Sequence, residues 1–553
     1  MTISRRDFIA GASITASLAL ARPTFSKARA AESSIDILVN EPIGRIDPNL
    51  YSHFVEHLGG VVYDGIWVGE NSKIPNVGGI RKSLVDALGK LRPGVIRYPG
   101  GCFADQYDWR DGVGPRDKRP TRVNFWADTN YKVSEDYKKL NSGPQKYEPN
   151  AFGTDEFMNL CRLVGAKPYL AANLRSLNVR AYLEWLEYCN APAGLTTLSS
   201  QRATNNSKDA YNVQYWGIGN ESWGCGGDFL PEEYAEEFRR FTAWLPTYGL
   251  KLQLIGSGPN GGDLGWTRRF FTKLTEKGQG QINKLYGWAL HYYCGTTGKG
   301  IADQYAEDEW YDLLARSDRM EGLIRDHWTT MGEIDRDHRV KLIVDEWGAW
   351  HNQDKDAPAA FLYAYAGTLR DALISGINLD TFQRNADKVV MANPAQLINT
   401  IHSLFYAHED KFVTTPNYHV FEMYMPHAGA TAVRTEFAAP QVAFSRNDST
   451  GKPTPVHLWG LSGSASINGK TVTLTVVNPD TKTPRETEIR ILGANMVAAD
   501  ARVLTAPDIH AKNTFEHPHG LEPKNETVNP SVDGKLVYRF APASVTRLSV
   551  QIA

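Results

Sequence analysis

A repeating order of short apolar strands and amphipathic helices runs through the chain from about residue 50 to residue 382. Alternation of this kind favours a parallel sheet, and eight units favour closure into an α/β fold, the (β/α)₈ TIM barrel. The segments predicted as strands are Leu50–Leu58, Val95–Tyr98, Pro168–Asn173, Val213–Asn220, Leu252–Gly256, Trp288–Tyr293, Leu342–Glu346 and Ile377–Phe382.

Helices are predicted between these strands because apolar residues recur there with helical spacing. Phe157, Leu160, Cys161 and Val164 follow the i, i+3, i+4, i+7 pattern, and Thr154 is placed to cap that helix. The predicted helices include Gly79–Leu91, Asp155–Val164, Val179–Cys189, Glu233–Tyr248, Trp266–Lys277 and Ala359–Leu373.

The pattern changes near Gln441, after which short alternating strands and turn signals such as Asn468-Gly469 replace the helical period. This change predicts a C-terminal antiparallel β-sandwich, jelly-roll-like in type. The strand Ile35–Asn40 has no helix beside it in the sequence, so we expect it to pair with that sandwich. The expected division is a signal segment at 1–30, this strand within 31–45, the barrel at 46–410 and the sandwich at 411–553.

The first 30 residues have the features of a twin-arginine export signal. Arg5-Arg6 precedes a weakly apolar stretch, Phe8–Ala21, and the small-residue site Ala28-Arg29-Ala30. The alternative, a membrane anchor, needs roughly 20 apolar residues, and this stretch is shorter. We expect a cleaved signal, a mature protein without a membrane segment, and a periplasmic or extracellular location.

Charge and cysteine content narrow the function classes. The 60 basic and 62 acidic residues nearly balance, which gives no reason to expect nucleic acid or an anionic membrane as partner. The five cysteines are too scattered for a disulfide framework and form no CxxC metal pair. Because the twin-arginine route carries folded protein out of a reducing cytoplasm, the thiols are expected to stay free.

Two glutamates end predicted strands in similar surroundings. Glu221 lies in VQYWGIGNESWGCGG, residues 213–227, and Glu346 lies in KLIVDEWGAW, residues 341–350. A parallel barrel brings the carboxyl ends of distant strands to one face, so these side chains should meet there. Glycoside hydrolysis requires such a pair, one acid to protonate the leaving oxygen and one carboxylate to attack or to activate water.

Neighbouring residues suggest supporting roles. Asn220 can hydrogen-bond a sugar hydroxyl, and His291 and Tyr293 end the strand next to that of Glu346. Tyr293 could donate to Glu346 and hold it ionised, and Arg97 could do so by its charge. A hydrogen bond at the barrel rim without a role in catalysis is the alternative for both.

One segment also matches a metal motif. His53-Phe54-Val55-Glu56-His57 fits H-x-x-E-H, which binds zinc from a helix, but Gly59-Gly60 follows at once and leaves no room for a helix. Glu56 is better interpreted as a ligand for sugar hydroxyls at the end of the first strand. The polar loop Gly112–Gly153 is either an active-site wall or an oligomer contact.

Six segments stand out as a set: WGIGNESWGCGG, RYPGGCFADQYDWRDGVGPRDKRP, LIVDEWGAW, DALISGINLDTF, MANPAQ and TPNYHVFEMY. By these segments the chain resembles the α-L-arabinofuranosidases of glycoside hydrolase family 51. The resemblance implies the same barrel and sandwich and a retaining exo-acting hydrolase, with Glu221 as acid/base and Glu346 as nucleophile. The substrates implied are terminal arabinofuranosyl residues of arabinan, arabinoxylan or arabino-oligosaccharides.

The resemblance also implies the residues around the sugar, and it implies no metal and no cofactor. The expected sugar contacts are Glu56, Cys102, Asn220, Tyr293 and Gln396, with Trp350 as a wall. A homo-oligomer is implied, since family members are often hexamers. Two open alternatives are a related glycosidase acting on β-xylosides or β-glucans and a non-catalytic carbohydrate-binding protein.

Three departures from the family's usual sequence concern the outer sugar subsites. They are the segment Ala172–Asn178, a polar insertion at about 129–149, and His351 in place of a usual tyrosine. These positions leave the preferred polymer open.

Overall fold

The computed structural model describes residues 32–127, 147–205, 207–358, 361–447, 451–528 and 535–553. The predicted signal segment and most of the predicted insertion at 129–149 lie outside the described residues. Among the residues that are described, none of the helices combines the length and the apolar character that crossing a bilayer requires.

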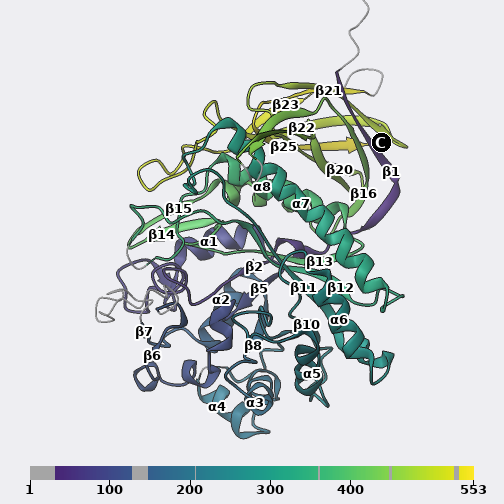
Figure 1. Cartoon of the computed structure of the whole chain (residues 1–553). Helices are drawn as coiled ribbons and strands as arrows, with labels where there is room; N and C mark the ends of the chain where they lie inside the picture. Colours follow the sequence, from purple (N-terminus) through teal and green to yellow (C-terminus); the bar gives the residue numbers. More distant parts are fainter. Residues whose placement is uncertain (1–31, 128–146, 206, 359–360, 448–450, 529–534) are drawn as a thin grey trace, which may run out of the picture. The chain divides into compact units, whose positions relative to one another are not determined.

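Eight parallel strands form the central sheet, in the spatial order β2, β5, β8, β9, β10, β11, β12, β13 (Figure 1). The first and last strands come together where the Leu397 N–H donates to the Phe54 carbonyl at 3.0 Å, so the sheet is nearly closed. Its strands are β2 (His53–Phe54), β5 (Val95–Tyr98), β8 (Lys167–Ala172), β9 (Tyr215–Ile218), β10 (Gln253–Gly256), β11 (Leu285–Gly295), β12 (Lys341–Ala349) and β13 (Val389–Pro394). The predicted barrel is confirmed.

The barrel interior is filled by side chains that different strands contribute. Seven apolar residues, one from each of β5, β8, β9, β10, β11, β12 and β13, form one buried cluster, as expected for a barrel with a packed centre. Its members are Val95, Tyr169, Tyr215, Ile255, Ala289, Ile343 and Met391. This core fixes the strand ends against one another and so fixes the residues that follow them.

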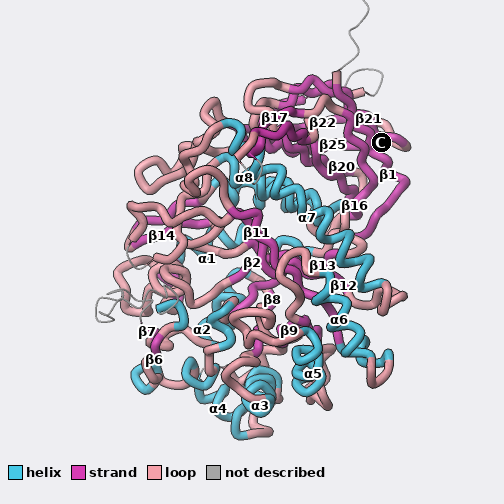
Figure 2. The backbone as a smooth tube through the Cα atoms, viewed as in Figure 1, coloured by secondary structure: helices cyan, strands magenta, loops and turns pink. Residues whose placement is uncertain are grey.

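Helices pack around the sheet and on the C-terminal domain (Figure 2). In α2 the apolar positions Phe157, Leu160 and Val164 are buried as predicted. The cap differs from the prediction, because Thr154 is the first helical residue and the Glu156 side chain accepts from Gly153 N at 2.8 Å. The helices are α1 (Lys82–Leu91), α2 (Thr154–Val164), α3 (Val179–Asn190), α4 (Thr197–Asn205), α5 (Pro231–Phe241), α6 (Leu264–Thr275), α7 (Glu307–Gly332), α8 (Leu369–Arg384) and α9 (Pro416–Tyr424).

The predicted eighth strand, Ile377–Phe382, is wrong, because this segment lies inside α8 and β13 is the true eighth strand. Every residue from Leu369 to Gln383 is buried, since α8 packs on the barrel on one side and on the C-terminal strands on the other. A helix that is buried on every side has no solvent-facing polar stripe to reveal its period.

The predicted first strand, Leu50–Leu58, is also shorter than expected. A 3₁₀ turn, η1 (Pro48–Tyr51), comes first, and only His53 and Phe54 pair with β5. Pro48 starts that turn, and the Asp47 side chain accepts from Asn49 N at 2.9 Å. The polar cap therefore competes with extension of the strand.

The C-terminal domain is a nine-stranded sheet whose two halves share one hydrophobic core. Its order is β23 (Lys524–Val528), β22 (Met496–Thr505), β25 (Ser544–Ile552), β20 (Thr471–Asn478), β19 (Ser462–Asn468), β16 (Thr431–Ala438), β1 (Ser33–Arg45), β21 (Arg485–Leu492) and β24 (Leu536–Phe540). The pairs are antiparallel except for β1 with β21.

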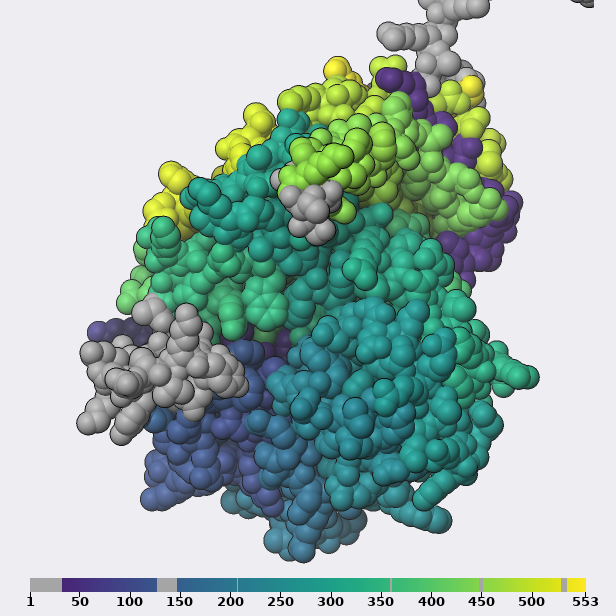
Figure 3. Space-filling view, in the orientation of Figure 1, coloured from purple at the N-terminus to yellow at the C-terminus, as the bar shows by residue number. Residues whose placement is uncertain are grey.

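The N-terminal strand β1 thus lies in the C-terminal sheet, between β16 and β21. In Figures 1 and 3 its purple residues run beside the green and yellow C-terminal segments. Four two-stranded sheets complete the described strands: β3 (Asn76–Val77) with β4 (Ile80–Arg81), β6 (Arg122–Val123) with β7 (Tyr147–Glu148), β14 (Phe405–His408) with β15 (Lys411–Thr414), and β17 (Val442–Asn447) with β18 (Pro453–Leu458).

Candidate active site

Glu221 and Glu346 meet at the carboxyl-end face of the barrel. Glu346 lies in β12, and Glu221 is three residues past the end of β9. One oxygen of each carboxylate and a ring nitrogen of His291 all lie within 4.8 Å of one another. This spacing fits a retaining pair, whose carboxyl groups are about 5 Å apart, rather than an inverting pair at about 6.5–9.5 Å.

Glu346 is held by two donors, Arg97 from β5 and Tyr293 from the adjacent strand β11. Arg97 Nη1 donates to its Oε1 at 2.8 Å, and the Tyr293 hydroxyl donates to its Oε2 at 2.7 Å. Burial alone would raise the pKa of Glu346, but the positive charges of His291 and Arg97 outweigh burial and lower it. Glu346 is therefore a buried carboxylate that stays ionised.

Glu221 has a more open environment than Glu346. Its side chain is 19% exposed, against 7% for Glu346. His291 Nδ1 lies 3.0 Å from Glu221 Oε1 and 3.5 Å from Glu346 Oε2, so the imidazole sits between the two carboxylates. Burial alone lowers the pKa of His291, but the two carboxylates outweigh burial and raise it.

The backbone is shaped around these side chains. A β-carbon on Gly101 would stand 3.1 Å from Glu346 Oε1 and 3.3 Å from Glu56 Oε2, so a glycine lets the loop after β5 approach both carboxylates. Glu221 itself has φ 39°, in the left-handed region that side chains other than glycine rarely adopt. Strain of this kind concentrates at functional sites.

A small pocket of about 50 Å³ opens onto both glutamates. Glu56 lines this pocket, and its carboxylate accepts from Phe103 N at 3.0 Å and from Gln396 Nε2 at 2.7 Å. Burial raises the pKa of Glu56 to about 7 in spite of these donors. The lining residues are Glu56, Leu58, Gly101, Cys102, Trp126, Glu221, Tyr293, Glu346, Trp350, Tyr363, Gln396 and Ile401.

The predicted site residues are brought together in two layers. Glu56, Cys102, Tyr293, Trp350 and Gln396 line the pocket beside the two glutamates. Behind the carboxylates, Asn220, His291 and Arg97 line a second small space with Asp345, and Asn220 Oδ1 accepts from Arg97.

Trp126 and Tyr363 are pocket residues that the sequence did not reveal. Trp126 belongs to η5 (Phe125–Ala127), in the long polar loop, and its Nε1 donates to Glu56 Oε1 at 3.1 Å. That loop therefore forms part of the pocket wall. The available signal was the aromatic pair Phe125-Trp126 within a mostly polar loop.

Cys102 and Cys225 form a disulfide, which contradicts the prediction of free thiols. They are 123 residues apart in the sequence, yet their Cα atoms are 5.5 Å apart because the loops after β5 and β9 meet on the barrel face. The spacing of the two cysteines along the sequence does not predict that they lie close together. Cys161, Cys189 and Cys294 are free and buried.

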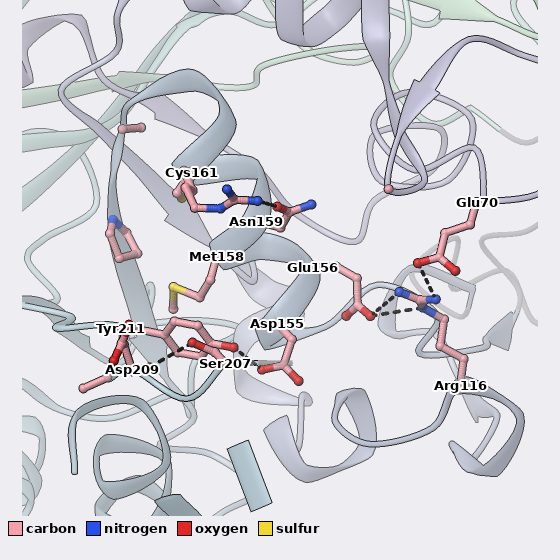
Figure 4. A pocket seen from close by; sticks show the side chains of 15 residues that line it. Glu70, Arg116, Asp155, Glu156, Met158, Asn159, Cys161, Ser207, Asp209 and Tyr211 are labelled. Carbon is pink, nitrogen blue, oxygen red and sulfur yellow. Dashed lines mark hydrogen bonds and ion pairs between the residues drawn. The ribbon is translucent and has the colours of Figure 1, made fainter. Parts of the chain in front are cut away.

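A larger cavity, about 610 Å³, lies against α2 and holds none of the predicted site residues (Figure 4). Several of its charged groups have partners within the cavity wall: Arg116 bridges Glu70 and Glu156, and Asp155 accepts from the Tyr211 hydroxyl at 2.7 Å. We assign the chemistry to the smaller pocket because convergent carboxylates lie there.

A carboxylate pair at this spacing on the carboxyl-end face of a parallel barrel defines a glycoside hydrolase site. Two family models match the chain, the α-L-arabinofuranosidase 1 domain over residues 87–293 and the α-L-arabinofuranosidase C-terminal domain over residues 345–544. The chain is also 34% identical to a Bacteroides ovatus protein named intracellular exo-α-L-arabinofuranosidase, over 94% of this chain and 96% of that protein.

A further relative, from Acetivibrio thermocellus, is 31% identical over 65% of this chain and 68% of its own length. It is named intracellular exo-α-(1→5)-L-arabinofuranosidase. Among solved structures, a family 51 arabinofuranosidase from Xanthomonas axonopodis pv. citri superposes with a TM-score of 0.85 at 31% identity, covering 94% of this chain and 100% of that one. This chain belongs to the α-L-arabinofuranosidases of glycoside hydrolase family 51.

The names of the two relatives contradict the predicted export, because both are called intracellular. That prediction rested on Arg5-Arg6 and a short apolar stretch within residues 1–30, a weaker signal than similarity over most of the chain. The periplasmic or extracellular location is withdrawn.

Proposed function

We propose that Glu346 is the nucleophile and Glu221 the acid/base of a retaining exo-α-L-arabinofuranosidase. The observation that carries this assignment is the pair of unlike environments around two adjacent carboxylates. Glu346 is buried and bonded to Arg97 and Tyr293, which favour its ionised form. Glu221 is more exposed, as a group that must reach the leaving oxygen and then water has to be.

The reaction proceeds in two displacements on the proposed assignment. Glu346 attacks the anomeric carbon while Glu221 gives its proton to the departing oxygen, which leaves an arabinosyl ester on Glu346. Glu221, now a carboxylate, takes a proton from water as the water attacks the same carbon. The ester breaks, arabinose leaves with retained configuration, and both glutamates return to their starting protonation states.

Sugar binding in this proposal uses the residues that line the pocket. Glu56, with a pKa of about 7, both donates and accepts hydrogen bonds near neutral pH, which suits a sugar hydroxyl. Gln396 donates to Glu56 and faces the same space, and Trp350 packs edge-to-face on Tyr293 at 4.9 Å between ring centres. A small pocket rather than an open groove suits one terminal sugar and therefore exo action.

The proposed substrates are arabinan, arabinoxylan and arabino-oligosaccharides with terminal α-L-arabinofuranosyl residues. The Acetivibrio thermocellus relative is named for α-(1→5) linkages, which supports arabinan-type substrates first. A panel of 4-nitrophenyl α-L-arabinofuranoside, β-D-xyloside and β-D-cellobioside tests the choice. Cleavage of the last two without the first would reject it.

We also propose a homo-oligomer for this enzyme, on the strength of the family resemblance alone. Light scattering coupled to size exclusion would measure the mass of the assembly directly. A particle of one chain, 61.6 kDa, at working concentration would reject the proposal.

The nucleophile assignment is tested by Glu346→Gly with added azide. The variant should lose about 10⁴-fold or more in kcat on 4-nitrophenyl α-L-arabinofuranoside, since it cannot form the covalent intermediate. Azide fits the space left by the side chain and should restore turnover with a glycosyl azide of inverted configuration as product.

Glu221→Ala is the matched comparison for that experiment. It should lose little on nitrophenyl substrates, whose leaving group needs no proton, and about 10²–10⁴-fold on arabino-oligosaccharides. Azide rescue of Glu221→Ala, attacking the intermediate, should give a product of retained configuration. If the two variants gave the same azide product, the division of roles would be wrong.

A further inference from the structure

The disulfide lies directly against one oxygen of Glu221. Cys102 begins η2 (Cys102–Asp105) after β5, and Cys225 follows Glu221 by four residues. The sulfurs of Cys102 and Cys225 lie 3.9 Å and 3.6 Å from Glu221 Oε2, and the other oxygen faces His291 at 3.0 Å. The two oxygens of this carboxyl group therefore have different neighbours.

The chemical state of those sulfurs matters for a general acid. A disulfide sulfur carries no hydrogen, so it packs against Oε2 without donating to it. A thiol is a weak donor, and a donor aimed at a carboxylate favours the ionised form over the protonated form. Reduction would also release the η2 loop from the loop that carries Glu221.

We propose that the Cys102–Cys225 disulfide is a positioning element for the proton donor Glu221, and that its reduction by a dithiol slows proton donation to the leaving group. This inference rests on the proposed role of Glu221 as acid/base. It assigns to the cross-link a function in catalysis beyond holding two loops together.

A small reductant can reach this bond. Cys102 lines the pocket, and both cysteines are partly exposed. A dithiol attacks one sulfur as its thiolate and forms a mixed disulfide, and its second thiol then displaces the other protein sulfur. The reductant ends as a cyclic disulfide, two electrons pass to the protein sulfurs, and two protons complete the thiols of Cys102 and Cys225.

The experiment compares kcat/KM of the whole enzyme before and after treatment with dithiothreitol on two substrates. One is 4-nitrophenyl α-L-arabinofuranoside, with a good leaving group, and the other is α-1,5-arabinobiose, with a poor one. Reduction should lower kcat/KM about tenfold or more on the biose and less than about twofold on the nitrophenyl substrate, because only the biose needs the proton. Thiol titration should show two new thiols, and diamide should restore the rate.

Controls separate this effect from loss of structure. Cys102→Ala/Cys225→Ala should not respond to dithiothreitol, and Cys294→Ser, which removes a buried free thiol, should respond like the wild type. Circular dichroism before and after reduction checks folding in the same samples.

The outcomes are distinct. Equal losses on both substrates, no loss despite two new thiols, or a response in the double variant would each overturn the inference. An oxidised enzyme without activity on either arabinoside would instead reject the proposed function itself.

Discussion

Arg97 makes polar contacts with three residues of the candidate site. It is 1% exposed, pairs with Glu346 and Asp345, and donates to Asn220. Asp345 also accepts from the Tyr169 hydroxyl at 2.7 Å, and Tyr169 belongs to the cluster that fills the barrel interior, so the barrel core fixes the position of Asp345. A fixed cation beside a buried carboxylate keeps that carboxylate ionised, which the proposed role of Glu346 as nucleophile requires.

We therefore expect Arg97→Met to shift the pH profile. Loss of the cation removes one cause of the lowered pKa of Glu346, so that pKa rises. On the proposed assignment Glu346 attacks in its ionised form, which exists above its pKa, so the acidic limb of kcat/KM should move to higher pH by about one unit or more. Activity would then be lost earlier as the pH falls.

Arg97→Lys is the control for charge, and it should shift the acidic limb less than Arg97→Met. Both variants need a thermal unfolding check, because removal of one partner of a buried pair costs about 3–5 kcal/mol. An unshifted acidic limb in a folded Arg97→Met enzyme would show that Arg97 does not tune the nucleophile.

At the scale of elements, the pocket is assembled from loops that only the barrel brings together. The wall includes Trp126 from η5 and Tyr363 from the loop after β12, whose rings meet edge-to-face at 6.0 Å. Tyr363 also contacts Trp350 at 5.1 Å. Six strand ends each supply a side chain to the site or to the layer behind it, namely those of β2, β5, β9, β11, β12 and β13.

We expect Trp126→Ala to weaken substrate binding more than it slows chemistry. The variant removes part of the pocket wall and one of the three donors to Glu56, while Glu221 and Glu346 keep their partners. KM for arabino-oligosaccharides should rise about tenfold, with kcat within about threefold of wild type. Initial-rate kinetics on purified enzyme provide the measurement.

Trp244→Ala is the matched control, because Trp244 is fully exposed and lies outside the residues that line the pocket. Its KM should equal that of the wild type. An unchanged KM in Trp126→Ala would remove the polar loop from substrate binding.

At the scale of the whole molecule, α8 joins the barrel to the C-terminal sheet through a buried acid. The Asp380 carboxyl accepts from Ser464 at 2.8 Å, from Thr475 at 2.6 Å and from the Tyr424 hydroxyl at 2.9 Å. Burial raises the pKa of Asp380 to about 7 in spite of these donors. The interface therefore favours a protonated Asp380 below neutral pH.

This raised pKa predicts a pH-dependent stability. The unfolded pKa of an aspartate is about 3.9, so between about pH 4 and pH 7 the folded state binds the proton more tightly than the unfolded state does. The contribution of Asp380 is thus largest at low pH and falls as the pH rises toward 7. The Asp380→Asn variant has no carboxyl group at this position, so its free energy of unfolding lacks this pH dependence.

Thermal unfolding of wild type and Asp380→Asn at pH 5 and pH 7.5 tests this prediction. The melting temperature of the wild type relative to the variant should fall by several degrees between the two pH values. Asp117→Asn, at a position 74% exposed, should track the wild type at both. A constant difference between wild type and Asp380→Asn would show that Asp380 does not titrate in this range.

Local patterns predicted much of this architecture from sequence. Seven of the eight barrel strands were found at least in part, because each is a short apolar run bounded by turn residues. The eighth was misplaced into α8, where burial on every side hides the helical period. The long helix α7 was not among the helical segments named from the sequence.

The residues of the candidate site were likewise predicted only in part. Glu221 and Glu346 were proposed from their strand-end motifs, and the structure brings them within contact of one histidine. The sequence did not predict Trp126 and Tyr363 as pocket residues or Cys225 as the disulfide partner of Cys102. Each of them contacts residues from distant segments of the chain. Export was predicted from a short terminal motif and is contradicted by the relatives.

By itself, the sequence determined the strand–helix alternation, the two acidic strand ends and the family, because each is written in residues close together along the chain. The tertiary structure alone decided the distance between the carboxylates, the charge of Glu346, the raised pKa values of Glu56 and Asp380, and the Cys102–Cys225 bond. Those properties depend on burial and on neighbours from distant segments, which only the closed barrel and its attached sheet bring together.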